Sequence, residues 1–236
     1  MLTIFLIIIF SFNQSIAAFS PKVFQGTYFE IERIIMENTL KRTFHKAEPH
    51  VPNDILEKVL MDSDNLINDE FSIPPYFQTS TTFWFKIYTQ YSSNQVLIHD
   101  KNNLNLTYNI IDFSTLKTSE INKFAVEHLQ TSLTEQYIER IRSIFIKLSK
   151  DMVVNDEEAN ELKKIIFNNI PRPKDKKKIK IFYTELANNI RSQTGQRDMI
   201  YRGIINATPY KKFIYDQFDN FKLPNELLAI PFLESS

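Results

Sequence analysis

Apolar side chains recur every three or four positions over most of the chain, which is the spacing of one helix face. The longest such stripe predicts a helix over residues 118–150, and a second helix is expected from 155 to about 171. Three consecutive acidic residues favour a helix start at this point, because negative charges in the first turn complement the helix dipole. The same spacing predicts shorter helices over 23–44 and 55–61.

One window of the chain alternates apolar and polar positions instead, which is the period of a strand. Residues 79–112 contain three such runs, at 81–90, 95–99 and 104–111, separated by turn-forming Ser, Asn and Asp residues. Short loops between short strands predict an antiparallel meander. The fold class predicted for the chain is therefore α+β, mostly α-helical with a small three-stranded antiparallel sheet.

A sheet of this size needs a partner for its apolar face. Phe83, Phe85 and Ile87 would share one face of the predicted first strand. We expect these three side chains to pack under the helix over 118–150.

The first 18 residues predict a secretory signal peptide. Residues 2–12 are almost continuously apolar, and this run of about eleven residues is too short to cross a bilayer, which takes about 20. The small residues at 15–18 follow it, as they do at a cleavage site, so a mature chain beginning near Ala18 or Phe19 is expected, with no stable membrane span. A buried strand or a single anchoring helix is the alternative. Export without disulfides indicates a bacterial periplasm.

Composition excludes several classes of function. The 28 Lys and Arg residues balance 28 Asp and Glu residues, which argues against a nucleic-acid partner. No cysteine is present, which excludes a thiolate zinc site, an iron–sulfur cluster and a cysteine nucleophile, and three glycines cannot form a dinucleotide fingerprint or a P-loop. His45, Glu48 and His50 lie close together, but their spacing is not that of two ligands on one helix face. We predict no metal site and no cofactor, and structural roles for His99 and His128.

The sequence Pro171-Arg172-Pro173-Lys174 predicts a boundary between an N-terminal region, 19–171, and a C-terminal region, 172–236. The basic run over 174–180 is expected to be a solvated linker and first helical turn, with contact to an anionic polymer such as a cell-wall glycan as the alternative.

Two short helices are expected over 196–221, with Thr208 capping the second of them and Pro209 at its first position. The second helix is predicted to bury four side chains against the helix at the end of the chain: Phe213, Ile214, Phe218 and Phe221.

The helix at the end of the chain is predicted to begin at Pro224, where the missing N–H of proline costs nothing. It carries Glu234 near its end, flanked by Phe232 and Leu233. Apolar surroundings would raise the pKa of this glutamic acid, so that it could donate a proton near neutral pH.

The last residues, LPNELLAIPFLESS, resemble the motif Leu-Pro-x-Glu-Leu-x-x-(Leu/Ile)-Pro-x-(Val/Leu)-Glu-Ser. This motif opens the catalytic domain of the lytic murein transglycosylase family, in particular of members like membrane-bound lytic murein transglycosylase D. Upstream residues are similar to the stretch that precedes the motif in such enzymes. They are Arg191, Gln193, Gly195, Gln196, Arg197, Asp198, Gly203 and Tyr210.

The resemblance covers about residues 180–236, and it implies that 172–236 are the opening helices of a goose-lysozyme-like catalytic domain. In that family one Glu cleaves the β-1,4 bond between N-acetylmuramic acid and N-acetylglucosamine, and the product is a 1,6-anhydro-muramoyl sugar. The resemblance thus implies that Glu234 is the catalytic acid and base, and that Ser235 orients it or lines the site. The implied partner is the peptidoglycan glycan strand, with no cofactor.

The sequence stops at Ser236, before the Phe-Asn-Pro and Gly-x-x-Gln segments and the further helices that complete the sugar cleft in the family. We therefore expect the 236-residue chain to be inactive by itself. One alternative is a non-catalytic periplasmic envelope protein that retains a remnant of the motif. A membrane-anchored structural protein is another alternative, and it rests only on the hydrophobic N-terminus.

Overall fold

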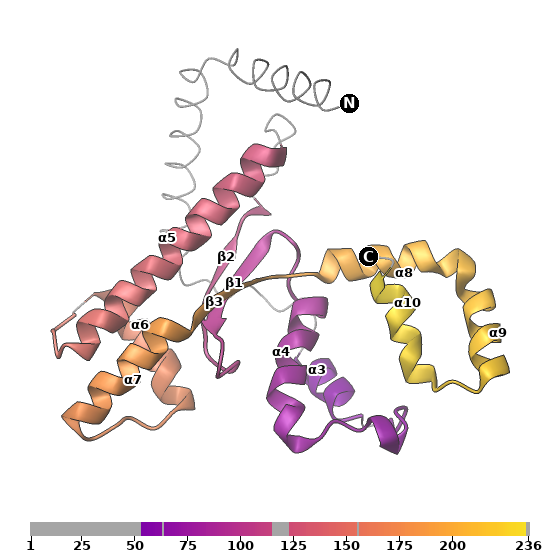
Figure 1. Cartoon of the computed structure of the whole chain (residues 1–236), viewed down its shortest axis with the longest axis horizontal. Coiled ribbons are helices and arrows are strands. Elements are labelled where there is room, and N and C mark those ends of the chain that lie inside the picture. Colours follow the sequence, from indigo (N-terminus) through magenta and orange to yellow (C-terminus); the bar gives the residue numbers. More distant parts are fainter. Residues whose placement is uncertain (1–52, 63, 115–122, 155, 235–236) are drawn as a thin grey trace, which may run out of the picture. The chain divides into compact units, whose positions relative to one another are not determined.

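The computed structural model describes residues 53–62, 64–114, 123–154 and 156–234 (Figure 1). They all belong to one structural unit, Phe44–Ser236. The predicted signal peptide, the predicted helix over 23–44 and the His45–His50 cluster lie outside the described residues.

The described elements are mostly helices, and they follow one another in this order: α3 (Asn53–Leu60), α4 (Gln78–Thr89), β1 (Gln95–Asp100), β2 (Thr107–Asp112), α5 (Lys123–Ser149), α6 (Glu157–Asn169), α7 (Lys176–Asn189), β3 (Ile190–Thr194), α8 (Arg197–Ala207), α9 (Lys211–Phe221) and α10 (Ala229–Glu234). The strands form one three-stranded antiparallel sheet. The predicted α+β class is confirmed. No described helix combines the length and the apolar character needed to span a bilayer.

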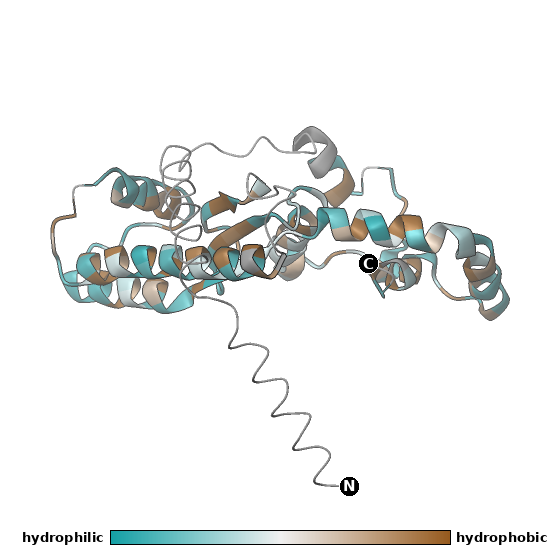
Figure 2. Cartoon of the chain, turned by 90° about the horizontal axis from the view of Figure 1, so that it is seen from above, coloured by the Kyte–Doolittle hydropathy of each residue, from teal (hydrophilic) through white to brown (hydrophobic). Residues whose placement is uncertain are grey.

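The central strand of the sheet is β1, in the order β2-β1-β3. Val96 lies opposite Ile111 of β2 on one side and Thr194 of β3 on the other. All residues of β1 after Gln95 are buried. In Figure 2 brown stretches mark the hydrophobic segments of the sheet, which lie between helices of mixed colouring. A strand buried along its length needs neighbours on both edges and cover on both faces, and the other elements provide them.

The first predicted strand, 81–90, is wrong: residues 81–89 lie in helix α4, and Gln90 caps its C-terminal end. Phe83 and Ile87 are four positions apart, so they share one helix face, and both pack with Leu97 of β1 in a buried cluster. Phe85 is only partly buried. The sheet also has no place for such a strand beside β1, because β2 and β3 already occupy its two edges.

Helix α5, predicted over 118–150, packs against α7 and β3, so it is not the cover expected for residues 83–87. Its Phe145 is fully buried, with its ring centroid 5.2 Å from that of Tyr108 in β2 and 6.3 Å from that of Tyr183 in α7. This one ring therefore joins the sheet to both helices.

Helix α6 begins where the acidic run predicted it. The Asp156 carboxylate accepts the backbone N–H of Ala159 at 2.6 Å, which satisfies one of the unpaired donors at the helix start. Ala159, Leu162 and Ile166 form its buried face.

The predicted boundary at 171–174 does not separate two domains. Helix α7 follows it and packs along α5, and β3 then pairs with β1. The C-terminal region thus completes the fold of the N-terminal one. The basic run is solvent-exposed at the start of α7, as expected for a solvated first turn, and Asp175 caps that helix by accepting the Lys178 N–H at 3.0 Å.

Helices α8 and α9 confirm the pair expected over 196–221, but two details are wrong. The Thr208 hydroxyl donates to the Ile204 carbonyl oxygen at 2.7 Å and does not cap α9. Phe213 and Phe221 are 65% and 71% exposed, so α9 does not bury them against α10.

A buried polar cluster closes the turn between β1 and β2. The Asp100 carboxylate accepts the backbone N–H groups of Asn102 and Asn103 at 2.8 and 2.9 Å and the Tyr108 hydroxyl at 3.1 Å. Burial first, and then the Asp100 charge, raise the pKa of Tyr108. With its oxygens occupied in this way, Asp100 tolerates its burial.

The neighbouring His99 lies in β1. Its Nδ1 lies 3.0 Å from the Asp100 carbonyl oxygen, and its ring centroid is 4.7 Å from that of Phe83. Burial lowers the pKa of His99, and the Arg191 charge adds to this effect, while the contacts with Asp100 oppose it. His99 is thus a core residue that favours its neutral form.

We predict that Phe145→Ala lowers the free energy of unfolding by about 3–5 kcal/mol, because it removes a buried ring shared by three elements. Denaturant unfolding of the purified protein measures this loss. The matched control is Phe213→Ala on an exposed face of α9, for which a change within about 0.5 kcal/mol is expected. Equal losses for the two variants would contradict the packing described.

A second prediction concerns acid stability. Because the folded state lowers the pKa of His99, the unfolded chain binds a proton more readily, and stability should fall as the pH drops below about 6.5. His99→Gln should remove this fall between about pH 6.5 and pH 5, whatever its effect on stability at pH 7. His128→Gln, at an exposed histidine of α5, is the control and should keep the wild-type pH dependence. An unchanged slope in His99→Gln would refute the argument.

Candidate functional site

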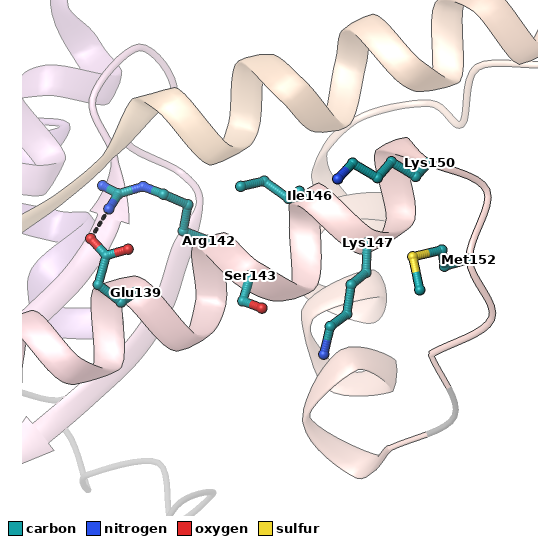
Figure 3. A pocket seen from close by; sticks show the side chains of 7 residues that line it. All are labelled: Glu139, Arg142, Ser143, Ile146, Lys147, Lys150 and Met152. Carbon is teal, nitrogen blue, oxygen red and sulfur yellow. Dashed lines mark hydrogen bonds and ion pairs between the residues drawn. The ribbon is translucent and has the colours of Figure 1, made fainter.

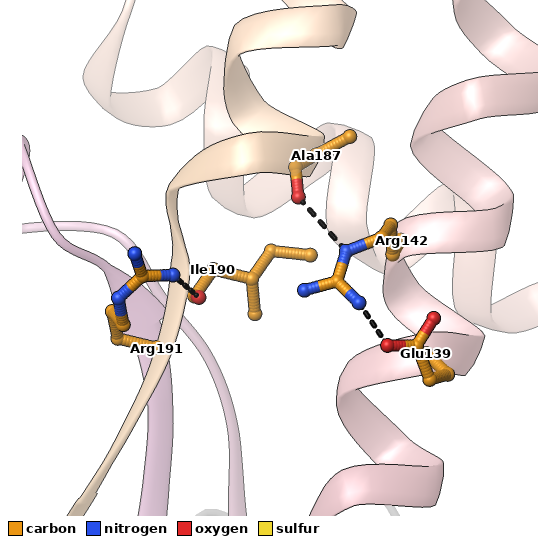
Figure 4. Close-up of polar contacts among 5 residues, drawn as sticks. All are labelled: Glu139, Arg142, Ala187, Ile190 and Arg191. Carbon is orange, nitrogen blue, oxygen red and sulfur yellow. Dashed lines mark hydrogen bonds and ion pairs between the residues drawn. The ribbon is translucent and has the colours of Figure 1, made fainter.

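A hollow of about 400 Å³ lies along the C-terminal part of α5 and the residues that follow it (Figure 3). Three of its seven lining residues are basic, and the full set is Glu139, Arg142, Ser143, Ile146, Lys147, Lys150 and Met152. The Arg142 guanidinium is already engaged: it pairs with Glu139 and donates from Nε to the Ala187 carbonyl oxygen at 3.3 Å (Figure 4). Glu234 does not line this hollow, so it is not the cleft that the sequence predicted.

Glu234, the predicted catalytic residue, is the last residue of α10, and its side chain is exposed. The preceding Leu233 is 42% exposed, and no hydrogen bond or ion pair joins the Glu234 side chain to another described residue. The described part of the chain therefore gives Glu234 no apolar enclosure. Ser235, the predicted orienting residue, lies outside the described residues.

The segment before α10 is fixed at two points. A short 3-10 helix (Asn225–Leu228) follows Pro224, and its Leu228 is buried. The Glu226 carboxylate accepts the backbone N–H of Asn68 at 2.8 Å, a contact between positions far apart in the sequence. Helix α10 then packs against α8, in which Gly203 is buried. Glu234 is thus held at the end of a helix that α8 supports.

Two of the motif residues upstream, Arg191 and Gln193, lie on the edge strand β3. Arg191 is exposed and donates from Nη1 to the carbonyl oxygen of Ile190 at 2.7 Å (Figure 4). Gln193 donates from Nε2 to the Thr194 carbonyl oxygen at 3.0 Å. Both side chains hydrogen-bond to neighbouring backbone, and the structure does not bring either to Glu234.

Gly195 stands where two backbone segments come too close for any side chain. A Cβ at this position would lie 2.4 Å from the carbonyl carbon and oxygen of Tyr91 and 2.5 Å from the Ser92 oxygen. These contacts are with backbone, which cannot move aside as a flexible side chain could. Glycine is therefore required here by packing, and the Gly195 N–H donates to the Gln95 oxygen at 2.9 Å.

The next three residues attach to the same turn between α4 and β1. The backbone N–H groups of Gln196 and Arg197 donate to the carbonyl oxygens of Ile87 and Tyr91, each at 2.9 Å. The Arg197 side chain donates from Nη1 to the Gln90 carbonyl oxygen at 2.9 Å.

Asp198 completes this attachment with its carboxylate. One oxygen accepts the Ser93 backbone N–H at 2.6 Å and the other accepts the Ser93 hydroxyl at 2.6 Å. Sequence reasoning missed Ser93 and Gln90 because they are more than a hundred positions away from their partners. The only local signal was the turn chemistry of Ser92-Ser93-Asn94.

Within the described residues, no group of three or more His, Asp or Glu side chains could hold a metal ion. Sequence reasoning also missed the ion pair between Glu158 of α6 and Arg140 of α5, in which the Glu158 side chain is mostly buried and the Arg140 side chain is half exposed. Burial raises the pKa of Glu158, and the Arg140 charge opposes that rise. This pair joins two helices and lies in no described cavity.

Comparisons with known proteins give no relative for this chain. No family model matches it, and no curated protein or solved structure does so either. Any function must be argued from its own residues.

Proposed function

We propose that this protein is a peptidoglycan lytic transglycosylase of the periplasm and that Glu234 is its general acid and base. The observation that carries the proposal is the wording of the last fourteen residues, in which the Glu234-Ser235 pair follows the Leu-Pro-x-Glu-Leu stretch at the spacing of the family motif. The upstream residues from Arg191 to Asp198 support it.

The proposed reaction needs only one carboxyl group. Glu234 protonates the oxygen that leaves with N-acetylglucosamine, and the 6-hydroxyl of the muramoyl sugar forms the new bond to its own anomeric carbon. Glu234 then takes the proton of that hydroxyl, so the carboxyl group returns to its starting form. Glycosidases that use water or a covalent intermediate need a second carboxylate, whereas here the nucleophile belongs to the substrate.

The exposed position of Glu234 supports its proposed role, but that role also requires other residues to cover the site. Its position at the exposed end of α10 makes it accessible to a polymer. Proton transfer to a sugar oxygen also requires that water be excluded. The proposal therefore requires cover over the exposed apolar side chains of the C-terminal helices, which in the family is provided by the helices that follow the motif. These side chains include Ile204, Ile205, Phe213, Phe221 and Ile230.

The exposure of Glu234 also favours a second candidate function, a non-catalytic envelope protein that binds peptidoglycan without cleaving it. Sedimentation of the 236-residue protein with purified sacculi tests this candidate. Binding with no product, in a form that carries the covering helices, would favour it over catalysis.

We predict that Glu234→Gln abolishes the release of anhydro-muropeptides by a form of the protein that carries the helices following the motif. Glutamine keeps the shape and the hydrogen-bonding capacity of the side chain but cannot deliver a proton, so a loss of about 10²–10⁴-fold is expected, with binding to sacculi nearly intact. Mass spectrometry of digested sacculi measures the product. The 236-residue chain is expected to release none, with or without the substitution.

The matched control is Glu185→Gln at an exposed position of α7, outside the C-terminal helices. Activity of this variant should stay near that of the wild type. Activity that survives Glu234→Gln would remove Glu234 from its proposed role, and a longer form that yields no anhydro product at all would refute the proposed function.

A further inference from the structure

We propose that Arg197 and Asp198 are positioning residues that lock the helices carrying Glu234 onto the turn between α4 and β1. We call this contact the latch: Gly195, Gln196, Arg197 and Asp198 on one side, and residues 87–93 on the other. The attachment is argued from the hydrogen bonds described above, whereas its effect on catalysis rests on the proposed function.

The first half of the latch uses the end of α4. A helix leaves its last carbonyl groups without intrahelical partners, and its C-terminal end carries a partial negative charge. The backbone N–H of Gln196 donates a hydrogen bond to the Ile87 carbonyl oxygen in the last turn of α4. The Arg197 guanidinium donates to the carbonyl oxygen of Gln90, just past the end of the helix. Arg197 thus satisfies an acceptor and complements the charge of the helix end.

The second half uses the start of α8. Asp198 lies in the first turn of that helix, where the N-terminal partial positive charge stabilises a carboxylate. Both of its oxygens accept hydrogen bonds from Ser93. Hydrogen bonds to a charged group are roughly twice as strong as neutral ones, so a short contact can carry much of the attachment.

Within the described residues, these helices bury few side chains, and α8 packs against α4 as well as against α10. The buried side of α8 consists of Gly203 and Ala207, and α9 buries no residue. Helix α10 packs against α8, so a rotation of α8 relative to α4 would carry Glu234 with it. The latch and the Glu226–Asn68 hydrogen bond are therefore the polar contacts that we expect to set the direction in which α10 projects.

Hydrogen–deuterium exchange on the 236-residue protein tests the latch directly. Asp198→Ala should speed exchange over residues 199–221 by about tenfold or more, since it removes two charge-assisted hydrogen bonds. The sheet peptides over 95–112 should exchange as in the wild type. The control is Asp216→Ala, an exposed aspartate of α9, which should change neither region.

Ser93→Ala is the milder second variant, because it removes the hydroxyl donor and keeps the backbone N–H. It should increase exchange in the same helices by less than Asp198→Ala does. If Asp198→Ala speeds exchange equally in the sheet and the helices, or in neither, the latch is not a local lock and the proposal fails.

Activity measurements on the form that carries the following helices then test positioning. Asp198→Ala should lower kcat for anhydro-product release, and Asp198→Asn, which keeps an acceptor for the Ser93 N–H, should recover part of it. The pH profile should stay as in the wild type, because Asp198 takes no part in proton transfer. A shifted profile, or equal losses in the two variants, would overturn a positioning role.

Failure of the latch and failure of the proposed function give different results. If even the wild type releases no anhydro product, the proposed function is refuted while the exchange data still decide whether the latch exists. If product forms and exchange does not change in Asp198→Ala, only the latch is refuted.

Discussion

The structure depends on β1, a strand buried along almost all of its length. Such a strand must have both edges paired and both faces covered, because water cannot reach its backbone groups. β2 takes one edge through a short turn that Asp100 closes. The other edge pairs with β3, which begins about ninety residues after β1 ends. Helices α5, α6 and α7 therefore belong to a long connection between β2 and β3, and this connection must end at the free edge of β1. The position of α8 then follows from that of β3.

Much of the helical part could be predicted because periodicity alone determines it. The stripe over 118–150 and the acidic start at 156 correspond to α5 and to the Asp156 cap of α6. The failure at 81–90 has a physical cause: Phe83 and Ile87 are spaced by four, which is compatible both with alternation and with one helix face. The choice between strand and helix depends on whether an edge of β1 is available for residues 81–90. Both edges are occupied, one of them by β3, and the sequence pattern gave no sign of β3.

The composition of β3 explains why the sequence pattern did not reveal this strand. Only Ile190 of its five residues is buried, and the others are polar and largely exposed, as suits an edge. It has no alternation to detect, and its residues were interpreted through a family resemblance instead. That resemblance identified Gly195 and its neighbours as important without giving a reason. The reason is a backbone approach to Tyr91 and Ser92, and it can be seen only when segments about a hundred positions apart are placed together.

The contacts of residues 195–198 with the turn between α4 and β1 also indicate a structural role for the charged residues that precede Glu234 in the sequence. Charged residues upstream of a catalytic glutamate are natural candidates for binding a substrate. In this chain both oxygens of the Asp198 carboxylate accept hydrogen bonds from Ser93, and the Arg197 guanidinium donates to the backbone of Gln90. These internal hydrogen bonds already fix the orientation of both side chains, and a ligand that displaced them would lose binding free energy. In the proposed reaction, the side chains nearer to Glu234 are then the candidates for contacts with a glycan strand, while the hydrogen bonds of Arg197 and Asp198 attach α8, against which α10 packs.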